Sequence, residues 1–475
     1  MDYSAIKEIR KQYGISQTKL AEYSGYTKQL ISKWELEKEY PSDEQIKKLE
    51  GVLNDLIPKI ESGEINLKGH RLVSTQKKSS KNRSYIKDAE DYAERCAGMS
   101  YDSEYSKILT KLYFDAKGSN DTKKYKGIGL FSGCGGLDLG FEAAGVEIIG
   151  HVEIWDAANK IYEQNFPNSK LLKEDINDVT DSDIRAWQEE FGSIDIIVGG
   201  PPCQGFSLAG KRDPEDLRNQ LYKQYVRIVD GLRPKVFVFE NVAKMTSMRN
   251  KDGRLFLDEI LCDFSEVGYS LVYKTVNACQ YGVPQSRERV LLVGIRTDIN
   301  KTFSFNEPKF SSDGSSLQVS LFEDKPRIRS FRYATEDLEL LEHGEASEKD
   351  PLHWAITHPE HIIDWLKDVP EGQSAHDNPD PSKRPPSGFN TTYKRIVWDE
   401  PCSTISTNFN MISGCRNVHP SCTRSFTVRE ATRAQSFPDE FVFCGKWGDV
   451  RKAIGNAVPP ILAYELAREI IEQIL

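Results

Sequence analysis

The amino-acid sequence predicts an α/β fold, a doubly wound domain with a smaller second domain, preceded by an all-α domain at the N-terminus. From residue 126 onward, short apolar stretches alternate with amphipathic stretches of helical period, which is the pattern of a doubly wound sheet. The first apolar stretch, GIGLF, runs directly into a glycine-rich turn. Residues 1–61 instead place apolar residues at helical intervals.

The length of 475 residues exceeds what one hydrophobic core organises, so we expect several domains. Residues 62–85 are basic and rich in serine, and residues 301–425 replace the strand–helix rhythm with irregular Pro, Gly, Ser and Asp clusters. We therefore predict a helical domain at 1–61, a basic linker and helical connector at 62–125, the α/β domain at 126–300, a smaller domain at 301–425, and a return to the α/β domain at 426–475.

Composition excludes several classes of protein. No stretch approaches the ~18 consecutive apolar residues of a membrane span, and the N-terminus lacks a secretory signal, so we expect a cytoplasmic protein without membrane contact. The nine cysteines are scattered, without CxxC spacing, which argues against a disulfide framework and a cysteine-rich zinc site. His358 and His361 form an HxxH without a nearby third ligand, which favours surface polarity over metal binding. We expect no metal.

Charge is spread unevenly along the chain. The net charge of −9 argues weakly against nucleic-acid binding, yet residues 1–126 hold 24 Lys and Arg against 20 Asp and Glu. Because a local basic face can bind phosphate on an acidic protein, the net charge does not exclude a nucleic-acid partner.

The N-terminal residues form a helix-turn-helix pattern. Gly25 marks a tight turn, and Thr27 is expected to cap the helix that follows. The residues predicted to pack between the helices are Leu20, Ala21, Ile31 and Trp34. The residues predicted to meet base edges and phosphates are Gln17, Lys28, Gln29, Ser32 and Lys33. Residues 9–49 resemble the repressor-type (Cro/XRE) helix-turn-helix family, which implies DNA binding; a helical bundle for dimerisation or protein contact is the alternative.

Acidic residues follow the first strands of the α/β domain. GIGLF continues into SGCGGLDLGFEAAG, Glu153 ends the next apolar stretch, and Asp175 follows the third. Acidic groups at successive strand ends suit the ribose hydroxyls and the adenine amino group of a nucleoside. A dinucleotide site is the alternative, but the phosphate-binding pattern GxGxxG is missing.

The candidate nucleophile and acid follow the fourth and fifth apolar stretches. IDIIVGG runs into PPCQGFS, where prolines place Cys203 on a loop, whereas a free cysteine is by default a small core residue. VFVFENV places Glu240 at a strand end, either as a helix cap or as a site acid. In YGVPQSRERVLLVGIR, Arg287 and Arg289 lie two apart on a predicted strand and so point to one face, for surface salt bridges or for a site.

These motifs resemble, in order, those of the DNA (cytosine-5-)-methyltransferases of restriction–modification systems. The resemblance continues through RIVWDEPCSTISTNF, TVREATRAQSFPDEF and IGNAVPPILAYELAREIIEQI to residue 475. It implies a doubly wound methyltransferase domain that binds S-adenosylmethionine, and a target recognition domain within residues 301–425. The residues that it places at the cofactor are Phe131, Ser132, Gly133, Gly135, Gly136, Leu137, Glu153, Ile154, Asp175, Ile176, Pro201, Leu221, Asn456 and Val458. The family often has an aromatic residue where Ile154 stands, so stacking on adenine is expected to be weaker there.

The resemblance also implies a mechanism. Cys203 attacks carbon 6 of a cytosine extruded from double-stranded DNA, and Glu240, held protonated, hydrogen-bonds ring nitrogen 3 and the amino group. Arg289 contacts the ring oxygen, and Arg287 steadies the cysteine loop or a DNA phosphate. Further DNA contacts are expected from Gln204, Ser207 and Thr404.

The expected function is methylation of one short DNA sequence, which protects it from a companion restriction endonuclease. The N-terminal domain is expected to bind operator DNA, as a dimer, and to regulate transcription, while catalysis needs only a monomer. The alternatives are a protein that is mainly a transcriptional regulator and a tRNA cytosine methyltransferase. The helix-turn-helix and the long recognition region oppose the tRNA alternative, and the occupied catalytic positions oppose a catalytically dead binding module.

Overall fold

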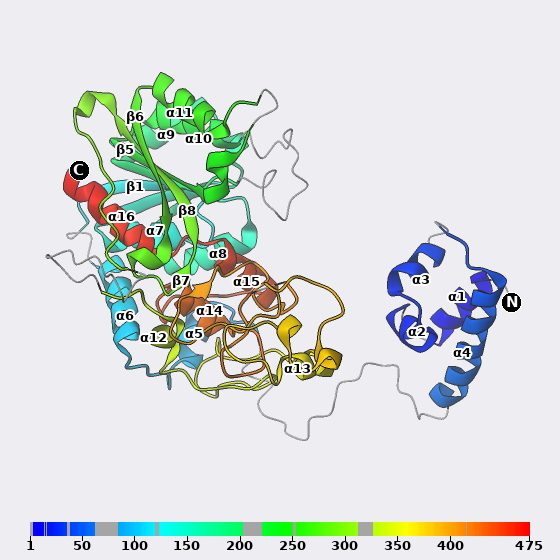
Figure 1. Cartoon of the computed structure of the whole chain (residues 1–475). Coiled ribbons are helices and arrows are strands. Elements are labelled where there is room, and N and C mark those ends of the chain that lie inside the picture. Colours follow the sequence, from blue (N-terminus) through cyan, green and yellow to red (C-terminus); the bar gives the residue numbers. More distant parts are fainter. Residues whose placement is uncertain are drawn as a thin grey trace. The chain divides into compact units, whose positions relative to one another are not determined.

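The computed structural model describes residues 3–13, 15, 17–35, 39–61, 84–118, 123–202, 221–249, 253–311, 326–414 and 416–475, and the statements below concern these residues. The chain divides into two compact units, Met1–Lys77 and Lys78–Leu475 (Figure 1). Within the described ranges, no helix is both long enough and apolar enough to cross a membrane.

The N-terminal unit contains four helices around one small core. The helices are α1 (Tyr3–Gln12), α2 (Gln17–Ser24), α3 (Lys28–Glu35) and α4 (Asp43–Glu61). Leu20, Ala21, Ile31 and Trp34 pack together as predicted, and residues of α1 and α4 complete the core. The Thr27 hydroxyl accepts a hydrogen bond from Leu30 N at 3.2 Å, which confirms the predicted cap of the second helix of the motif.

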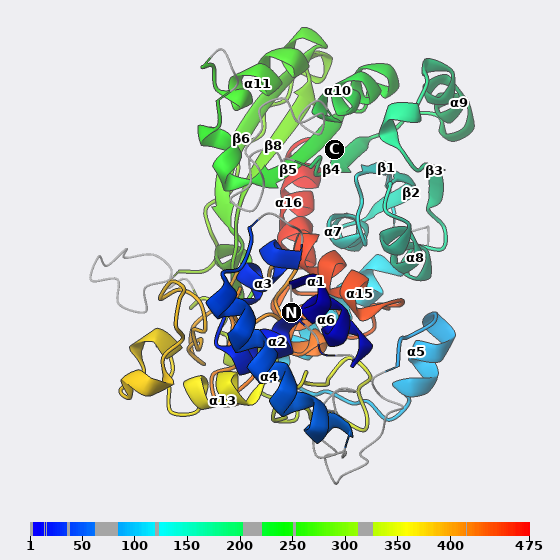
Figure 2. The same ribbon diagram turned by 90° about the vertical axis from the view of Figure 1, so that its right-hand side faces the viewer.

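A seven-stranded sheet forms the centre of the second unit. Its strands are β1 (Tyr125–Leu130), β2 (Val146–Val152), β3 (Lys170–Lys173), β4 (Ile196–Gly199), β5 (Val236–Val242), β6 (Tyr269–Asn277) and β8 (Glu288–Arg296). The order is β3-β2-β1-β4-β5-β8-β6, and Figure 2 shows this succession across the sheet. β1 to β5 pair in parallel, whereas β8 runs antiparallel to both β5 and β6. The predicted doubly wound domain is confirmed, with a sheet that is mixed at one edge.

Helices cover both faces of this sheet. One face packs against α6 (Glu104–Ala116), α7 (Gly136–Ala143) and α16 (Pro460–Gln473), and the other against α9 (Asp181–Phe191), α10 (Leu221–Leu232) and α11 (Phe256–Glu266). α16 and α7 lie side by side (Figures 1 and 2). A side chain at Gly140 would place its Cβ 2.4 Å from the Ala463 Cβ and 2.5 Å from the Pro460 carbonyl oxygen. Glycine therefore permits the close contact of the two helices.

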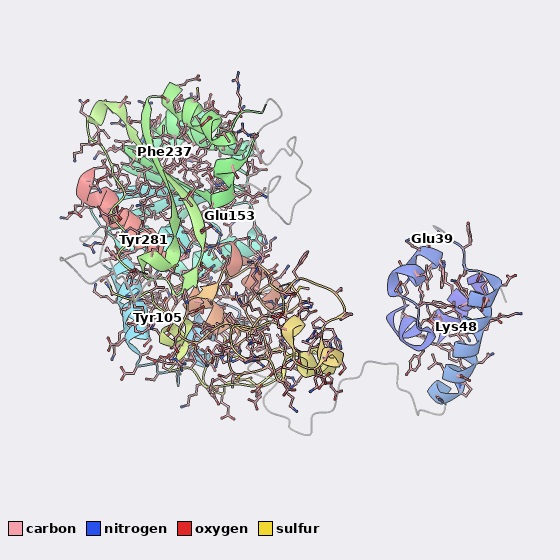
Figure 3. All side chains as sticks on the ribbon, in the orientation of Figure 1. Glu39, Lys48, Tyr105, Glu153, Phe237 and Tyr281 are labelled. Carbon is pink, nitrogen blue, oxygen red and sulfur yellow. The ribbon has the colours of Figure 1, made fainter. Side chains whose placement is uncertain are left out.

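A second core lies below the sheet as Figure 1 is drawn. Its elements include α5 (Ala89–Arg95), α8 (Asp156–Asn165), α12 (Phe331–Thr335), α14 (Val428–Ala434) and α15 (Trp447–Asn456), together with the two-stranded sheet of β7 (Gln285–Ser286) and β9 (Cys402–Ser403). A smaller cluster follows around α13 (Glu360–Leu366). Figure 3 shows Phe237 in the upper part of the unit, Tyr105 in the lower part and Glu153 between them.

The final fifty residues serve both cores. The expectation for residues 426–475 was a return to the α/β domain. In the structure, only α16 lies against the sheet, while Ala431, Val450 and Ile454 are buried in the second core with Phe331 and Phe409. α14 therefore packs against α12 of the segment 326–425, and α15 packs against α8 of the α/β domain.

Candidate active site

The predicted site residues follow the carboxyl ends of parallel strands. Phe131 follows β1, Glu153 follows β2, Gly200 follows β4, and Glu240 lies near the end of β5. Carboxyl ends of parallel strands meet at one edge of the sheet, which is where doubly wound domains bind their ligands. The backbone therefore assembles one site from four separated motifs.

The glycine-rich loop is held close to Glu153. Glu153 Oε2 accepts a hydrogen bond from Gly133 N at 2.8 Å, and Oε1 accepts one from Trp155 N at 2.8 Å. Burial raises the pKa of Glu153, and this effect outweighs the backbone hydrogen bonds, which lower the pKa because they favour the charged form. Phe131 takes a left-handed conformation with φ of 57°, which is strained for an aromatic residue and turns the chain sharply out of β1. Each carboxylate oxygen keeps a lone pair, so this loop fits a ligand with ribose hydroxyls.

The C-terminal motif closes over the same loop. A Cβ at Gly136 would lie 2.4 Å from the Val458 carbonyl oxygen, so the chain before α16 touches the start of α7. At Gly455, a Cβ would lie 2.4 Å from Thr407 N. Asn456 ends α15 and is exposed, whereas Val458 and Leu137 are buried. Ser132 is partly buried, and Gly135 has φ of 90°.

The remaining cofactor candidates differ in exposure. Ile154 is 64% exposed beside Glu153, as an open apolar surface. Asp175 Oδ1 accepts the backbone N–H of Asn177 at 2.9 Å and so caps the 3-10 helix η3 (Ile176–Asp178). Ile176 is buried in the sheet core. Leu221 begins α10 and packs against that core.

A buried acid in the glycine-rich motif had no predicted role. Asp138 on α7 is 1% exposed. Its carboxyl group and the Ser132 hydroxyl both lie against Gly129. Burial raises the pKa of Asp138 to about 7. An acid within an otherwise apolar helix start, GLDLGF, was the available sequence signal.

Cys203, Gln204 and Ser207 lie outside the described residues, but the chain that leads to them is described. Asn241 Nδ2 donates to the Pro201 carbonyl oxygen at 3.0 Å. A Cβ at Gly200 would lie 2.8 Å from Glu240 Oε2, so the glycine lets the carboxyl group lie against the backbone. The ENV motif assigns no role to Asn241, and in the structure its side chain anchors the chain two residues before Cys203.

Glu240 and Arg289 form an ion pair. Arg289 Nε lies 2.9 Å from Glu240 Oε1, and the two side chains are 13% and 11% exposed. The pairing of Val242 with Arg289 across β5 and β8 sets this geometry. The antiparallel strand β8 therefore delivers a guanidinium group to the acid at the end of β5.

Arg287 does not point to the same place. It is 1% exposed, and it donates to the carbonyl oxygens of Ile405 (3.2 Å), Gly455 (3.0 Å) and Ala457 (2.9 Å). Burial lowers the pKa of Arg287, and the nearby Arg289 adds to this. Arg287 was predicted to steady the cysteine loop or a DNA phosphate, and in the structure its guanidinium group is buried against these three carbonyl groups. Arg287 joins the C-terminal end of α15 to the segment around Ile405.

The DNA-contact candidates are exposed in part. Thr404 is exposed, and its hydroxyl donates to the Ser286 carbonyl oxygen at 2.8 Å. In the N-terminal unit, Gln17 Nε2 donates to Glu35 Oε2 at 2.9 Å, and exposed Lys33 pairs with Glu39. Ser32 is partly buried. Lys28 and Gln29 begin α3, and their side chains lie outside the described part.

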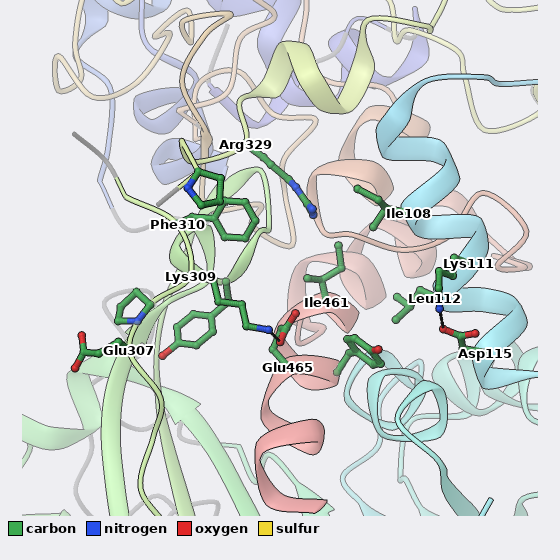
Figure 4. Close-up of a pocket in the computed structure, with 14 residues that line it drawn as sticks. Ile108, Lys111, Leu112, Asp115, Glu307, Lys309, Phe310, Arg329, Ile461 and Glu465 are labelled. Atoms are coloured by element: carbon green, nitrogen blue, oxygen red, sulfur yellow. Dashed lines mark hydrogen bonds and ion pairs between the residues drawn. The ribbon is translucent and has the colours of Figure 1, made fainter. Parts of the chain in front are cut away.

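A cavity of about 790 Å³ opens elsewhere in the second unit. Ile108, Leu112, Phe310 and Ile461 line it, and the ion pairs Lys111–Asp115 and Lys309–Glu465 also lie at its walls (Figure 4). None of the predicted site residues lines this cavity. The cavity is therefore separate from the candidate residues at the strand ends.

The described residues hold no cluster of His, Cys, Asp or Glu that could bind a metal ion. The expectation of surface polarity at the HxxH holds for exposed His361 but is wrong for His358, which is buried. His358 Nε2 accepts the backbone N–H of Ser425 at 3.1 Å, and burial lowers the pKa of His358 to about 4. His358 is therefore a neutral hydrogen-bond acceptor of the fold.

Two family models match the chain. The model of the C-5 cytosine-specific DNA methylase family matches residues 125–472, and that of a helix-turn-helix family matches residues 6–56. Type II methyltransferase M.DdeI of Desulfomicrobium norvegicum is 34% identical over 72% of this chain and 88% of that protein. Type II methyltransferase M.Sau96I of Staphylococcus aureus is 34% identical over 78% of this chain and 82% of that protein.

Solved structures agree on the fold. A prophage-encoded DNA modification methyltransferase from E. coli has a TM-score of 0.56 at 24% identity, covering 74% of this chain and 99% of that chain. The Entamoeba histolytica methyltransferase EhMeth has a TM-score of 0.51 at 16% identity, covering 74% and 98%. With the family match over residues 125–472, this chain belongs to the C-5 cytosine-specific DNA methylase family and is a Type II DNA (cytosine-5-)-methyltransferase with an N-terminal helix-turn-helix domain of the Cro/XRE type.

Proposed function

We propose that this enzyme methylates carbon 5 of a cytosine flipped out of one short double-stranded DNA sequence, with Cys203 as the nucleophile. The main support is the arrangement around Pro201 and Glu240. Asn241 anchors the Pro201 carbonyl two residues before Cys203, and the Glu240–Arg289 ion pair lies against the adjoining Gly200. A carboxyl group and a guanidinium group thereby lie beside the chain that leads to Cys203.

Each group has a chemical task in this proposal. The sulfur of Cys203 adds to carbon 6 of cytosine, which raises the electron density at carbon 5. Glu240, protonated in the complex, holds a proton at ring nitrogen 3 and hydrogen-bonds the amino group, while Arg289 donates to the ring oxygen. Carbon 5 accepts the methyl group, and loss of its proton together with Cys203 restores the aromatic ring. The pair observed between Glu240 and Arg289 keeps both groups ordered before the base arrives.

We assign the cofactor pocket to the glycine-rich loop and its neighbours. S-adenosylmethionine, when bound, supplies the methyl group as a sulfonium. Glu153 offers acceptor lone pairs to the ribose, exposed Ile154 offers an apolar face to the adenine, and Asp175 accepts from the adenine amino group. The residues that complete the proposed pocket are Phe131, Ser132, Gly133, Gly135, Gly136, Leu137, Ile176, Pro201, Leu221, Asn456 and Val458.

We assign target reading to residues 326–425. This segment exposes Phe389 (78%) and Met411 (50%), large apolar side chains that are available to bases. The loops that carry them are joined by a hydrogen bond from Tyr393 N to the Ile412 carbonyl oxygen at 3.3 Å. Gln204, Ser207 and Thr404 are proposed as further DNA contacts. Extruding a base costs a few kcal/mol, which such contacts offset.

The test is incubation of unmethylated DNA with tritiated S-adenosylmethionine, followed by bisulfite sequencing. The parent protein is expected to label cytosines in one short motif, and Cys203→Ser to label none. Cys262→Ser, at an exposed cysteine of α11, is the matched control and should keep full activity. Label in tRNA but not in DNA would refute the substrate. Label in neither would leave transcriptional regulation as the main function.

A second activity is proposed for the N-terminal unit: repression of its own gene or of a companion endonuclease gene by binding operator DNA as a dimer. Lys33 is exposed on α3, the second helix of the motif. Gln29→Ala with Lys33→Ala is expected to lose operator binding in a gel-shift assay, with methylation unchanged. Lys59→Ala, at an exposed lysine of α4, is the charge-matched control. Retained operator binding and repression in the double variant would contradict this role.

A further inference from the structure

The segment before the first strand, residues 84–118, had no predicted role beyond a connector. In the structure it forms α5 and α6 and belongs to the second unit. Tyr105, Leu109 and Leu112 of α6 are buried in the same core as Phe141 of α7. This arm, as we name residues 84–118, is therefore fixed to the sheet that carries the catalytic motifs.

The arm also contacts two buried arginines of α14. Arg429 and Arg433 are fully buried and pair with acidic groups. Arg429 Nε lies 2.6 Å from Asp350 Oδ2, and Arg429 Nη1 lies 3.0 Å from Asp439 Oδ1. Arg433 Nη2 lies 2.7 Å from Asp439 Oδ2, and Arg433 also pairs with Asp337. Because Asp337 and Asp350 lie in the segment 326–425, this network fastens that segment to α14.

Three tyrosines of the arm direct their hydroxyl groups at this network. The Tyr101 hydroxyl donates to Asp350 Oδ2 at 2.8 Å, and the Arg433 guanidinium group lies 4.4 Å from the centre of the Tyr101 ring. The Tyr92 hydroxyl accepts from Arg429 Nη2 at 2.7 Å and donates to the Asp439 carbonyl oxygen. The Tyr105 hydroxyl donates to the Arg433 carbonyl oxygen at 3.1 Å.

These contacts are directional as well as close. A buried carboxylate and a buried guanidinium group need every hydrogen-bonding position filled, and a neutral hydroxyl fills a position without adding charge. Asp350 thus receives hydrogen bonds from both Arg429 on α14 and Tyr101 on the arm. A shift of the segment relative to the sheet would break bonds at both partners.

We propose that Tyr101 and Tyr92 are positioning residues that set the placement of the segment 326–425 over the catalytic groups, and thereby the choice of target sequence. This inference rests on the proposed target-reading role of that segment. If the segment 326–425 adopts its DNA-binding placement only part of the time, the apparent affinity for DNA falls in proportion to the fraction of molecules in that placement. Removing one hydroxyl group therefore weakens productive DNA binding and loosens discrimination between sequences, while the binding of S-adenosylmethionine is unchanged.

The test compares Tyr101→Phe with the parent protein in steady-state methylation of cognate and one-mismatch duplexes. The expected result is about a tenfold rise in KM for cognate DNA, the fold-change for about 1.4 kcal/mol of hydrogen-bond free energy. kcat and the Kd for S-adenosylmethionine stay near the parent values, and the relative rate on mismatched DNA rises. Tyr113→Phe, on α6 of the same arm with its ring packed against Phe114, is the matched control.

Tyr92→Phe is the second variant and should show the same split, in case Tyr101→Phe fails to fold. Parent KM and parent target choice in folded forms of both variants would overturn the inference. A simultaneous loss of kcat, of affinity for S-adenosylmethionine and of thermal stability would also overturn it, because the tyrosines would then only stabilise the fold. Phe389→Ala distinguishes a failure of this inference from a failure of the target-reading role on which it rests. If Phe389→Ala leaves KM and target choice unchanged, the target-reading role fails. If the parent protein labels no DNA, the proposed function fails.

Discussion

Gly455 and Gly448 lie on the same helix, α15, but in different surroundings. A Cβ at Gly455 would lie 2.4 Å from Thr407 N and 2.5 Å from the Ser406 carbonyl carbon, both backbone atoms. A Cβ at Gly448 would meet nothing within 4 Å, and neither glycine has a positive φ. Alanine at either position therefore adds helix propensity, but the packing consequences at the two positions are opposite.

The magnitudes follow from these contacts. Glycine to alanine within a helix stabilises by about 0.8–1 kcal/mol. At Gly455, overpacking against backbone costs about 1–3 kcal/mol, so a net destabilisation of up to about 2 kcal/mol is expected. At Gly448 only the gain remains, reduced because this residue lies in the first turn. Since Arg287 bonds to the carbonyl oxygens of Gly455, Ala457 and Ile405, the displacement at Gly455 should also shift the chain that follows α15.

The assay is urea unfolding of both variants and the parent, with titration of S-adenosylmethionine by calorimetry. We expect Gly455→Ala to unfold at lower urea and to bind the cofactor more weakly, and Gly448→Ala to match or exceed the parent in both. If Gly455→Ala were as stable as Gly448→Ala, residues 405–407 would be free to move away, and the close approach would not constrain the site.

Three further predictions follow from the same geometry. Glu240→Gln should lower kcat by about 10²–10⁴-fold because the acid is lost, while a gel shift reports unchanged DNA binding; near-parent turnover would remove Glu240 from the mechanism. Asn241→Ala should lower kcat, and it should also lower the free energy of unfolding by about 0.5–1.5 kcal/mol, because the Pro201 carbonyl group loses its hydrogen-bond donor. A normal kcat in stopped-flow assays would contradict the anchoring role. Burial raises the pKa of Asp138 from 3.8 to about 7, so its contribution to stability is complete below pH 3.8 and is lost as pH rises through 7. Asp138→Asn should therefore gain stability over the parent at pH 8, by at most about 4 kcal/mol, and little at pH 4; an equal difference at both pH values in urea unfolding would refute the assignment.

Local patterns predicted much of the site. The GIGLF strand and its glycine-rich turn, the acid after β2, and the ENV strand end could be read because each signal lies within about ten residues. The helix-turn-helix core could be read for the same reason: Leu20, Ala21, Ile31 and Trp34 repeat at helical spacing, and their packing is confirmed.

Long-range packing decided the rest. Arg287 and Arg289 look equivalent in QSRER, but the break between β7 and β8 buries Arg287 among carbonyl groups 118 to 170 residues away and leaves Arg289 beside Glu240. The apolar pattern of β8 does not predict that β8 runs antiparallel to β5, because strand order and direction depend on which strand edges pair in the folded chain.

The sequence by itself determined the chemistry-bearing residue types and the helices and strands that present them, because these depend on neighbours along the chain. Only the tertiary structure decided that the arm belongs to the methyltransferase unit, where Tyr92, Tyr101 and Tyr105 meet the arginines of α14 across more than 300 residues of sequence. A tyrosine in a helix carries no record of its partner, since burial and hydrogen-bond geometry arise only when distant segments pack together.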